Sequence, residues 1–178
     1  MKLHKVVLFI ICGLPFSGKT YLSTKISESF GIQRISYDDL WKEIHQKESR
    51  DPNWEEICSI VEARVADELK AGRSVVYDTL NDTVGNREKL KKIAKNNDGE
   101  AIVIYADTPL DVIHSRRKEN VESGDRHEVS EKNFQGALDR FEVPRPPEVV
   151  FRRTPNQPIE AWLVDLERFI KDAYSVSD

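Results

Sequence analysis

The chain has 178 residues, of which 39% are hydrophobic and 33% are charged, and its formal net charge is −4. This length allows one well-buried α/β core, whereas two domains would each lie near the lower size limit, so we expect one domain over residues 1–178. The composition excludes collagen-like, coiled-coil and largely disordered chains, and the negative charge argues against a surface built throughout to bind duplex nucleic acid.

The apolar segment over residues 6–12 follows Lys2 and Lys5, an arrangement with a superficial likeness to a secretory signal. Its seven apolar residues are too few for such a signal, and no small-residue cleavage site follows them. Only two cysteines are present, Cys12 and Cys58, which excludes a disulfide framework and a structural zinc cluster and fits a reducing compartment. We therefore expect a cytoplasmic protein without a membrane segment, and the sequence leaves a monomer and a homodimer open.

The first predicted element is a strand over residues 6–12, whose apolar side chains fit a central parallel strand buried on both faces. It leads into GLPFSGKT at residues 13–20, which satisfies the pattern G-x-x-x-x-G-K-[ST], and a helix is predicted over 19–29. This order forms a P-loop, in which backbone N–H groups and the helix N-terminus bind phosphate oxygens. The residues expected to contact the nucleotide are Gly13, Leu14, Pro15, Phe16, Ser17, Gly18, Lys19, Thr20 and Tyr21.

Two side chains of this loop carry specific chemistry. Lys19 would reach the β and γ phosphates, and the Thr20 hydroxyl would coordinate magnesium, so we predict ATP and Mg²⁺ as cofactors. The chain lacks the N-K-x-D sequence with which GTPases recognise guanine, since KNND at 95–98 has the wrong order, and it is too short for the sensor domains of a motor ATPase. A kinase is the remaining common class.

A second strand is predicted over residues 32–36 and a helix over 39–47. Between them, Asp38 and Asp39 would lie at the carboxyl edge of the sheet, where one of them could take the proton of a phosphoryl acceptor. The alternative is that both residues only cap the helix that begins there. Trp41 would share a helix face with Asp38, where it either stacks on a flat acceptor or packs in the core.

A long helix is predicted over residues 54–71, followed by a strand over 74–78 that ends at Asp78. This carboxylate occupies the place from which P-loop proteins hold magnesium, directly or through water, and its alternative role is that of a turn residue. Asn81 and Arg87 lie in the loop and helix that follow. We expect both to shape the acceptor pocket.

The segment at 119–130, ENVESGDRHEVS, is polar and has few apolar anchors, which is typical of a mobile lid, although an ordinary surface loop has the same composition. Arg126 within it, and Arg116 and Arg117 on the helix that opens near Pro109, are candidates for stabilising the negative charge of a transition state. Neighbouring helix positions point in different directions, so Arg116 and Arg117 should differ in role.

The remaining predicted elements are helices over 84–96, 130–141 and 158–174 and strands over 101–106 and 148–152. Strands that alternate with helices form right-handed crossovers and a mostly parallel sheet with helices on both faces. The predicted fold is therefore a three-layer α/β sandwich with ligands at the carboxyl ends of its strands.

The chain resembles the AAA-domain group of P-loop kinases, which includes polynucleotide 5′-hydroxyl kinase, zeta toxin, chloramphenicol phosphotransferase and seryl-tRNA kinase. The segments that carry the resemblance are, in chain order, GLPFSGKT, SYDD, VVYDTLNDTVGNR, PLDVIHSRR, GDRHEVS and RFEVPRPPE. The resemblance covers most of the chain and is nearest to uncharacterised ATP-binding members. It implies a P-loop kinase fold whose five-stranded parallel sheet has the order 2-3-1-4-5, with a small helical lid.

The same resemblance implies roles for particular residues. Asp38 would be the acceptor-side base and Arg126 the lid arginine. Adenine would lie between the helix that carries Arg116 and the loop after the last strand. The residues assigned in this way are Lys19, Asp38, Arg116 and Arg126 for catalysis, Thr20 and Asp78 for magnesium, and Arg116, Arg153, Pro155 and Asn156 for the nucleotide.

Trp41 stands where the polynucleotide kinases have an arginine that holds the acceptor's phosphate. Together with the net negative charge and the absence of a basic stripe with interleaved aromatic residues, this favours a small polar hydroxyl compound as acceptor. A kinase of a nucleic-acid end is the weaker alternative. A third hypothesis is an ATP-binding regulatory module with little turnover of its own.

Overall fold

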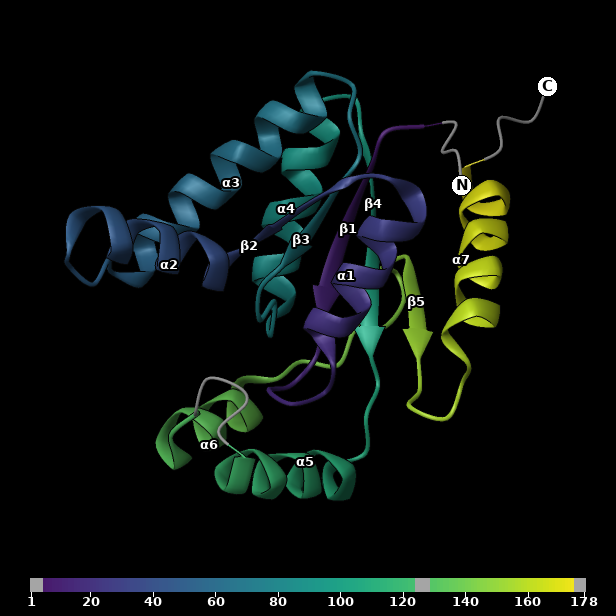
Figure 1. Ribbon diagram of the computed structural model, residues 1–178. Helices are drawn as coiled ribbons and strands as arrows, with labels where there is room; N and C mark the ends of the chain where they lie inside the picture. The colour runs from purple at the N-terminus through teal and green to yellow at the C-terminus, as the bar shows by residue number, and fades with distance from the viewer. Residues whose placement is uncertain (1–4, 124–128, 175–178) are drawn as a thin grey trace.

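The computed structural model describes residues 5–123 and 129–174, in which five strands and seven helices follow one another along the chain (Figure 1). The strands are β1 (Val7–Cys12), β2 (Gln33–Ser36), β3 (Val75–Asp78), β4 (Glu100–Ala106) and β5 (Val150–Arg153). The helices are α1 (Lys19–Phe30), α2 (Tyr37–Glu48), α3 (Trp54–Lys70), α4 (Val84–Asn96), α5 (Leu110–Ser123), α6 (Glu131–Arg140) and α7 (Ile159–Tyr174). These bounds lie within two residues of the predicted ones wherever both were predicted.

All the strands join one sheet in the order β2-β3-β1-β4-β5, and each neighbouring pair is parallel. This is the order that the kinase resemblance implies. In the register, Ile11 of β1 lies opposite Asp78 of β3, and Asp78 lies opposite Ser36 of β2. The ends of these three strands therefore bring together the residues that lead into the P-loop, into α2 and into the loop before α4.

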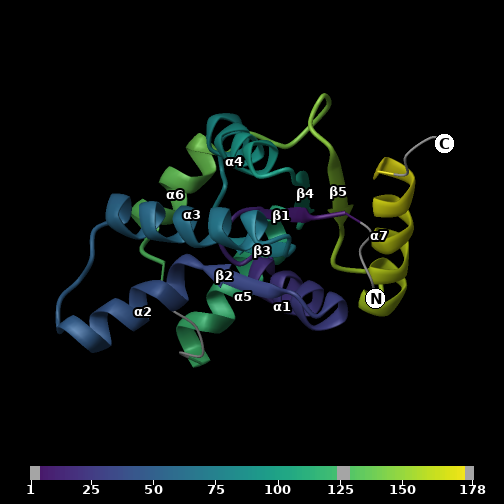
Figure 2. The same cartoon turned by 90° about the horizontal axis from the view of Figure 1, so that it is seen from above.

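The central strand β1 is buried on both faces, as its apolar sequence predicts. Because successive side chains of a strand point to opposite faces, Phe9 and Ile11 pack in a core with α1 and α7. Leu8 and Ile10 pack in a second core with α2, α3 and α4. Seen from above, α3 and α4 lie on one side of the sheet and α1 on the other (Figure 2), which confirms the three-layer sandwich.

Two helices begin as local sequence dictates. The Asn53 side chain accepts a hydrogen bond of 2.8 Å from the backbone N–H of Glu56 and so caps α3. Ser36 does the same for α2, where its hydroxyl oxygen accepts from the N–H of Asp39 at 3.1 Å. This cap starts α2 at Tyr37, earlier than predicted, and it shows that Asp38 and Asp39 are not the capping residues.

The first part of the predicted lid belongs to a helix, since α5 extends to Ser123. Lysine, glutamate and arginine favour helix well, so a polar sequence did not by itself mark the end of α5. The remainder of the segment, including Arg126, falls largely within 124–128, outside the described residues. Among the helices of the described ranges, none combines the length and apolar character that crossing a membrane requires.

Candidate active site

The loop between β1 and α1 has the backbone conformation of a phosphate cradle. Gly13 and Gly18 have φ angles of 153° and 99°, in the region that side-chain-bearing residues rarely adopt. A Cβ atom at Gly13 would lie 2.6 Å from Oγ of Ser17, so the tight turn depends on glycine at this position. The backbone N–H of Ser17 closes the turn by donating to the carbonyl oxygen of Leu14 at 3.1 Å.

The N-terminus of α1 has no side-chain cap, because its N-cap residue is Gly18. Next to it, the Oγ atom of Ser17 is buried and has no hydrogen-bond partner among the described residues. Unsatisfied polar groups at this depth are costly unless a ligand or water completes them. A helix N-terminus with free N–H groups and a neighbouring hydroxyl fits an anion such as a nucleotide phosphate.

Lys19 folds back over the loop, and its Nζ donates to the carbonyl oxygen of Leu14 at 2.8 Å. Burial of the ammonium group lowers the pKa of Lys19, while the charges of nearby carboxylates act in the opposite direction. The carboxylates that act on Lys19 include those of Asp78, Asp38 and Asp82, which come from three different segments of the chain. Carboxylates from three segments of the chain therefore oppose the effect of burial on Lys19.

Asp78 is buried at the end of β3 and is held by two partners. Arg34 of β2 donates to its Oδ2 from Nη2 at 2.7 Å and from Nε at 3.0 Å, and the hydroxyl of Ser23 donates to the same oxygen at 2.7 Å. All of these contacts use Oδ2, so Oδ1 is the oxygen that could bind a metal or its water. Sequence analysis missed Arg34, and its only signal was an arginine inside a short strand that precedes an acidic turn.

The two aspartates of α2 differ in their surroundings. Asp39 forms an ion pair with Nη1 of Arg34, which ties the first turn of α2 to Asp78. Asp38 is exposed at the same turn, and its charge acts on Lys19. Asp38 is therefore exposed and unoccupied by Arg34, whereas Asp39 belongs to an ion-pair network with Arg34 and Asp78.

Arg116 and Arg117 point in different directions, as expected from their positions on α5. Nη1 of Arg116 donates to the carbonyl oxygens of Phe16 and Ser17 at 3.1 and 3.2 Å, so this guanidinium lies against the P-loop. Arg117 pairs instead with Glu131 of α6 at 2.7 Å. The hydroxyl of Thr108, just before α5, also donates to the carbonyl oxygen of Ser17 at 2.8 Å.

Arg153 at the end of β5 lies next to Tyr21 of α1. The central carbon of its guanidinium group, Cζ, is 5.7 Å from the centroid of the tyrosine ring. One of its η nitrogens donates to the carbonyl oxygen of Gln157 at 3.0 Å, and its Nε is buried without a partner among the described residues. Pro155 and Asn156 are in the loop that follows β5. The structure thus brings together Tyr21 and Arg153, which sequence analysis assigned to the nucleotide from distant parts of the chain.

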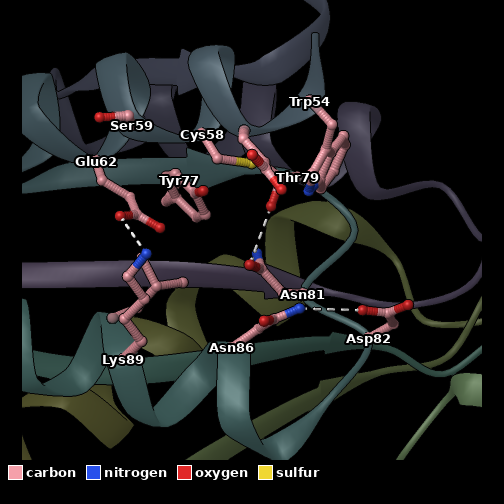
Figure 3. Close-up of a pocket in the computed structure, with 12 residues that line it drawn as sticks. Trp54, Cys58, Ser59, Glu62, Tyr77, Thr79, Asn81, Asp82, Asn86 and Lys89 are labelled. Atoms are coloured by element: carbon pink, nitrogen blue, oxygen red, sulfur yellow. Dashed lines mark hydrogen bonds and ion pairs between the residues drawn. The ribbon is translucent and has the colours of Figure 1, made fainter.

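A pocket of about 310 Å³ opens between α3, the loop after β3 and α4 (Figure 3). We call it the side pocket. Its lining includes Trp54, Glu55, Cys58, Ser59, Glu62, Tyr77, Thr79, Asn81, Asp82, Asn86, Lys89 and Leu90. Asn81 lines it, and the Asn81 side chain donates to the carbonyl oxygen of Ile11 at 2.7 Å, which ties this loop to the strand that leads into the P-loop. Trp54 and Asp82 were not singled out in the sequence, since only the packing of α3 against the β3 edge brings them together.

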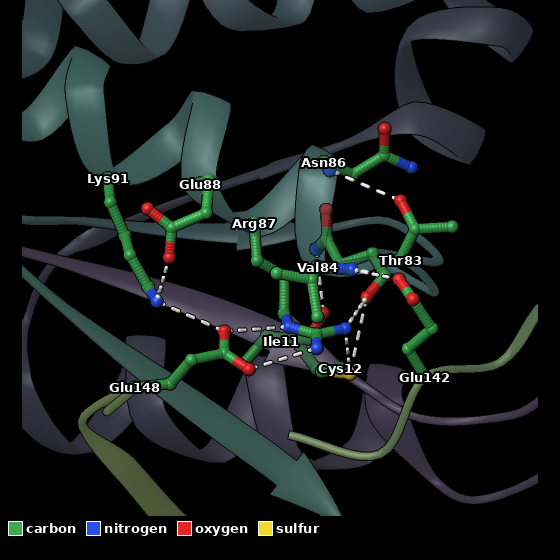
Figure 4. Close-up of polar contacts among 11 residues, drawn as sticks. Ile11, Cys12, Thr83, Val84, Asn86, Arg87, Glu88, Lys91, Glu142 and Glu148 are labelled. Carbon is green, nitrogen blue, oxygen red and sulfur yellow. Dashed lines mark hydrogen bonds and ion pairs between the residues drawn. The ribbon is translucent and has the colours of Figure 1, made fainter. Parts of the chain in front are cut away.

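Arg87 and Trp41 do not line this pocket. The guanidinium of Arg87 is fully buried, where it forms two hydrogen bonds to Glu148 at 2.9 and 3.0 Å and one to the carbonyl oxygen of Asn81 (Figure 4). Of the two roles that the sequence left open for Trp41, the structure shows core packing: its ring packs against the core beside α2 and stacks on the ring of His45, with 4.8 Å between ring centroids.

No group of three or more histidine, cysteine, aspartate or glutamate side chains suited to a metal ion occurs in the described part of the chain. Magnesium bound to a nucleotide does not need such a group, because it uses one or two protein oxygens together with phosphates and water. Thr20 and Asp78 fit that pattern and meet at Ser23, whose single hydroxyl hydrogen has both the carbonyl oxygen of Thr20 at 2.9 Å and Oδ2 of Asp78 at 2.7 Å as possible acceptors.

Several solved structures, two of them described as kinases, share this fold. Chaetomium thermophilum Kti12 in complex with ADP-AlF3 superimposes with a TM-score of 0.77 and 22% identity, over 95% of this chain and 100% of the other. A putative kinase from Chloroflexus aurantiacus has a TM-score of 0.75 and 17% identity, over 93% of this chain and 99% of the other. A gluconokinase from Sinorhizobium meliloti has a TM-score of 0.68 and 19% identity, over 100% of both chains. Identities this low establish the fold alone.

Among curated proteins, the L-seryl-tRNA(Sec) kinase of Methanococcus maripaludis is 26% identical over 149 residues, which cover 78% of this chain and 53% of that protein. The chain thus spans about half the length of the curated relative it matches. A sequence model described as AAA domain matches residues 8–144, which include the P-loop, Asp38, Asp78 and Arg116. Because this match covers most of the chain and the solved kinases share its sheet, the chain belongs to the AAA domain family, with a P-loop kinase fold.

Proposed function

We propose that this protein is an ATP-dependent kinase that transfers the γ-phosphoryl group to a hydroxyl of a small polar acceptor. The observation that carries the proposal is the position of Lys19. Its ammonium donates to the carbonyl oxygen of Leu14 in the P-loop at 2.8 Å. In the sheet, Asp78 lies opposite Ile11, which precedes this loop, and opposite Ser36, which caps the helix that carries Asp38. This arrangement, with the side pocket after β3, supports a phosphate site, a base and an acceptor pocket at one edge of the sheet.

The nucleotide would bind with its phosphates on the N-terminus of α1 and its adenine between Tyr21, Arg153 and α5. Ser17 and the N–H groups of the loop would donate to phosphate oxygens. Arg116 already lies against the loop, so its guanidinium would stabilise charge that develops there. Thr20 and Oδ1 of Asp78 would hold magnesium, which when bound neutralises phosphate charge and orients the γ-phosphoryl group.

Phosphoryl transfer requires an oriented acceptor hydroxyl and a group that takes its proton. Asp38 is exposed on the first turn of α2 and has no role in capping the helix, so its carboxylate is available for this proton. Arg34 bridges Asp39 and Asp78 and thereby fixes that turn relative to the metal site. The side pocket would hold the rest of the acceptor.

A kinase of a tRNA-linked hydroxyl is the second candidate. The 26% identity to the L-seryl-tRNA(Sec) kinase favours it, although this chain spans about half of that protein. Nucleic-acid binding depends on neutralising phosphates with lysine and arginine. The net charge of −4 and the uncharged Trp41 in place of a phosphate-holding arginine make this candidate the weaker one.

A screen for acceptor-dependent ADP release tests the proposal. Purified protein with ATP and Mg²⁺ would be offered sugars, aminosugars, nucleosides, hydroxylated amino acids, 5′-hydroxyl oligonucleotides and seryl-tRNA. The proposal requires release that rises with at least one small acceptor. Efficient release with the nucleic acids alone, falling steeply as salt increases, would support the second candidate instead. Release that never exceeds the acceptor-free rate would contradict both and support the regulatory module.

A further inference from the structure

We propose that the side pocket selects a polyhydroxylated ring that carries an amine, and that it discriminates against anionic acceptors. This inference rests on the proposed function, since it names the class of acceptor for the same site. It comes from the charge, the hydrogen-bonding groups and the size of the pocket.

The lining of the side pocket has an excess of negative charge. Three carboxylates, Glu55, Glu62 and Asp82, face one ammonium group, Lys89, which gives −3 + 1 = −2 for the set. The Lys89 ammonium is already paired with a carboxylate of the same lining, because Oε2 of Glu62 lies 2.6 Å from its Nζ (Figure 3). A carboxylate or phosphate in this pocket would have to compete with Glu62 for Lys89 and would be repelled by the remaining carboxylates.

Asp82 is the most buried carboxylate of the lining, and an ammonium group could bind it alongside its present partners. It is buried, whereas the guanidinium that reaches it, from Arg140 at 3.2 Å, belongs to a side chain that is 58% exposed and is therefore screened by solvent. Its other partner is the neutral amide of Asn86 at 3.3 Å. Asp82 follows Asn81, whose side chain donates to the carbonyl oxygen of Ile11 at 2.7 Å, so a ligand held here would lie beside the strand that leads into the P-loop.

The rest of the lining suits a hydroxylated ring. Ser59 and Asn86 are exposed side chains that can exchange hydrogen bonds with hydroxyl groups. Trp54 is 52% exposed and packs on Tyr37 with 4.3 Å between ring centroids, so it offers a fixed apolar face for the C–H groups of a ring. A volume of about 310 Å³ lies at the low end for ligand pockets and suits a compact molecule.

The thiol of Cys58 lines the side pocket, so its reactivity can be used to measure ligand binding there. Cys58 is half-buried in the lining, and burial raises its pKa; Glu62 raises it further, and Lys89 lowers it. The other cysteine, Cys12, is fully buried, so alkylation of the folded protein at mildly alkaline pH reports on Cys58. Loss of labelling in Cys58→Ser verifies this assignment.

The experiment measures how well ligands protect Cys58 from iodoacetamide in the absence of ATP. Aminosugars, neutral sugars and uronic acids of similar size would be compared, and all of them lack phosphate. We expect aminosugars to protect at concentrations about tenfold or more below those of uronic acids, as one added favourable or unfavourable ion pair implies. Equal protection by the two classes, or none by any class, would overturn the proposal.

Charge variants make the test independent of the particular ligand. Glu62→Gln frees Lys89 and should reduce the preference for aminosugars over uronic acids about tenfold, whereas Lys89→Gln should increase it. Glu68→Gln is the matched control, because Glu68 lies on the same helix and pairs with Arg73 at 2.6 Å outside the pocket. A preference that stays the same in both Glu62→Gln and Lys89→Gln would contradict the proposal.

The ligand class of the side pocket and the kinase function can be contradicted separately. Protection of Cys58 by aminosugars without any acceptor-dependent ADP release would leave the ligand class standing and contradict the kinase function. ADP release that depends on acceptors but prefers uronic acids would leave the kinase function standing and overturn the ligand class.

Discussion

At the scale of single residues, the carboxylates at the carboxyl edge of the sheet differ in their hydrogen-bond and ion-pair partners. Asp78 is bound to Arg34 and Ser23, Asp39 is bound to Arg34, and Asp38 is exposed near Lys19. The ion pairs leave Asp38 as the carboxylate available to an acceptor hydroxyl.

Replacing Asp38 with asparagine should lower phosphoryl transfer by about 10² to 10⁴, the usual contribution of a positioned general base, and should leave ATP affinity nearly unchanged. Asp39→Asn is the matched control, because it removes a neighbouring carboxylate that is already paired. Steady-state kinetics with ATP titrations separate the two effects. Equal losses in both variants, or a greater loss in Asp39→Asn, would show that the base is assigned to the wrong residue.

Sequence reasoning found the residues that belong to contiguous motifs, because the spacing in GLPFSGKT is itself a geometric requirement. It missed Arg34, Asp82 and Trp54, whose positions result from the packing of different elements. It did not show that Arg87 is buried, since a sequence does not show which side of a helix faces the core when the residue is charged. The burial of Arg87 depends on its ion pair with Glu148, which lies far along the chain, so the local sequence did not indicate it.

At the scale of elements, the ion pair between Arg87 and Glu148 holds three segments together. Arg87 is on α4, Glu148 precedes β5, and Arg87 also donates to the carbonyl oxygen of Asn81 and, at 3.8 Å, to the sulfur of Cys12 at the end of β1 (Figure 4). Lys91 lies 3.1 Å from the same carboxylate. The loop that lines the side pocket is therefore fixed from behind by a buried charge network.

Arg87→Leu should destabilise the protein by about 3 to 5 kcal/mol, because it leaves the buried carboxylate of Glu148 without its main partner. Lys91→Ala should cost much less, since Lys91 is partly exposed. Denaturant unfolding of both variants measures the difference. Similar losses in the two would mean that the buried pair does not hold these segments together.

The same pair gives stability a dependence on pH. Burial acts to raise the pKa of Glu148, but hydrogen bonds and charge from Arg87 and Lys91 hold it below the ordinary 4.5. Because the folded-state pKa is the lower one, the contribution is fully present above about pH 4.5 and is lost as the pH falls through the folded value. A smaller loss of stability on acidification in Glu148→Gln than in the wild type would agree with this sign.

Helix α5 illustrates how one element serves two purposes. Arg116 contacts the carbonyl oxygens of the P-loop, and Arg117, the next residue, pairs with α6 and lies 4.7 Å from the ring centroid of Phe134.

Arg116→Ala should weaken ATP binding about 10- to 100-fold, in line with the loss of charge-assisted hydrogen bonds. Arg117→Ala should leave the affinity nearly unchanged, and equal weakening in both would contradict the separation of roles. Titration calorimetry with a non-hydrolysable analogue measures both.

Element positions were largely predictable because β-branched runs, helical spacing and caps act locally, and the cap of α3 at Asn53 is a direct example. The starts that shifted have local causes as well, as with Ser36 at α2. The end of α5 was not predictable, because the polar residues that suggested a lid also favour helix.

At the scale of the whole molecule, alternating strands and helices indicated a parallel sheet, but they did not determine its order. The order 2-3-1-4-5 came from the resemblance to P-loop kinases, and the structure confirms it. This order places β1 between β3 and β4, so the P-loop lies at the centre of the carboxyl edge between Asp78 and α5.

Because ligands bind the native state only, ATP with Mg²⁺ should stabilise the whole protein. At about 100 times the dissociation constant the gain is about 2.7 kcal/mol, which corresponds to roughly 5 to 10 °C in Tm for a chain of this size. Thermal unfolding by calorimetry measures it. Adenosine, which lacks phosphates, should give much less, and an equal shift with adenosine would contradict binding through the P-loop.

The central claim is that Lys19 lies in a site that moves the γ-phosphoryl group of ATP to an acceptor. The measurement that tests it most directly is transfer of γ-labelled phosphate from ATP to an acceptor found by the screen, in the wild type, Lys19→Ala and Lys25→Ala. Lys25 is the matched control, because it lies on α1 but pairs with Glu28 away from the loop at 2.8 Å. We predict that labelled product forms in the wild type and Lys25→Ala and is lost in folded Lys19→Ala. Unchanged product in folded Lys19→Ala would contradict the account.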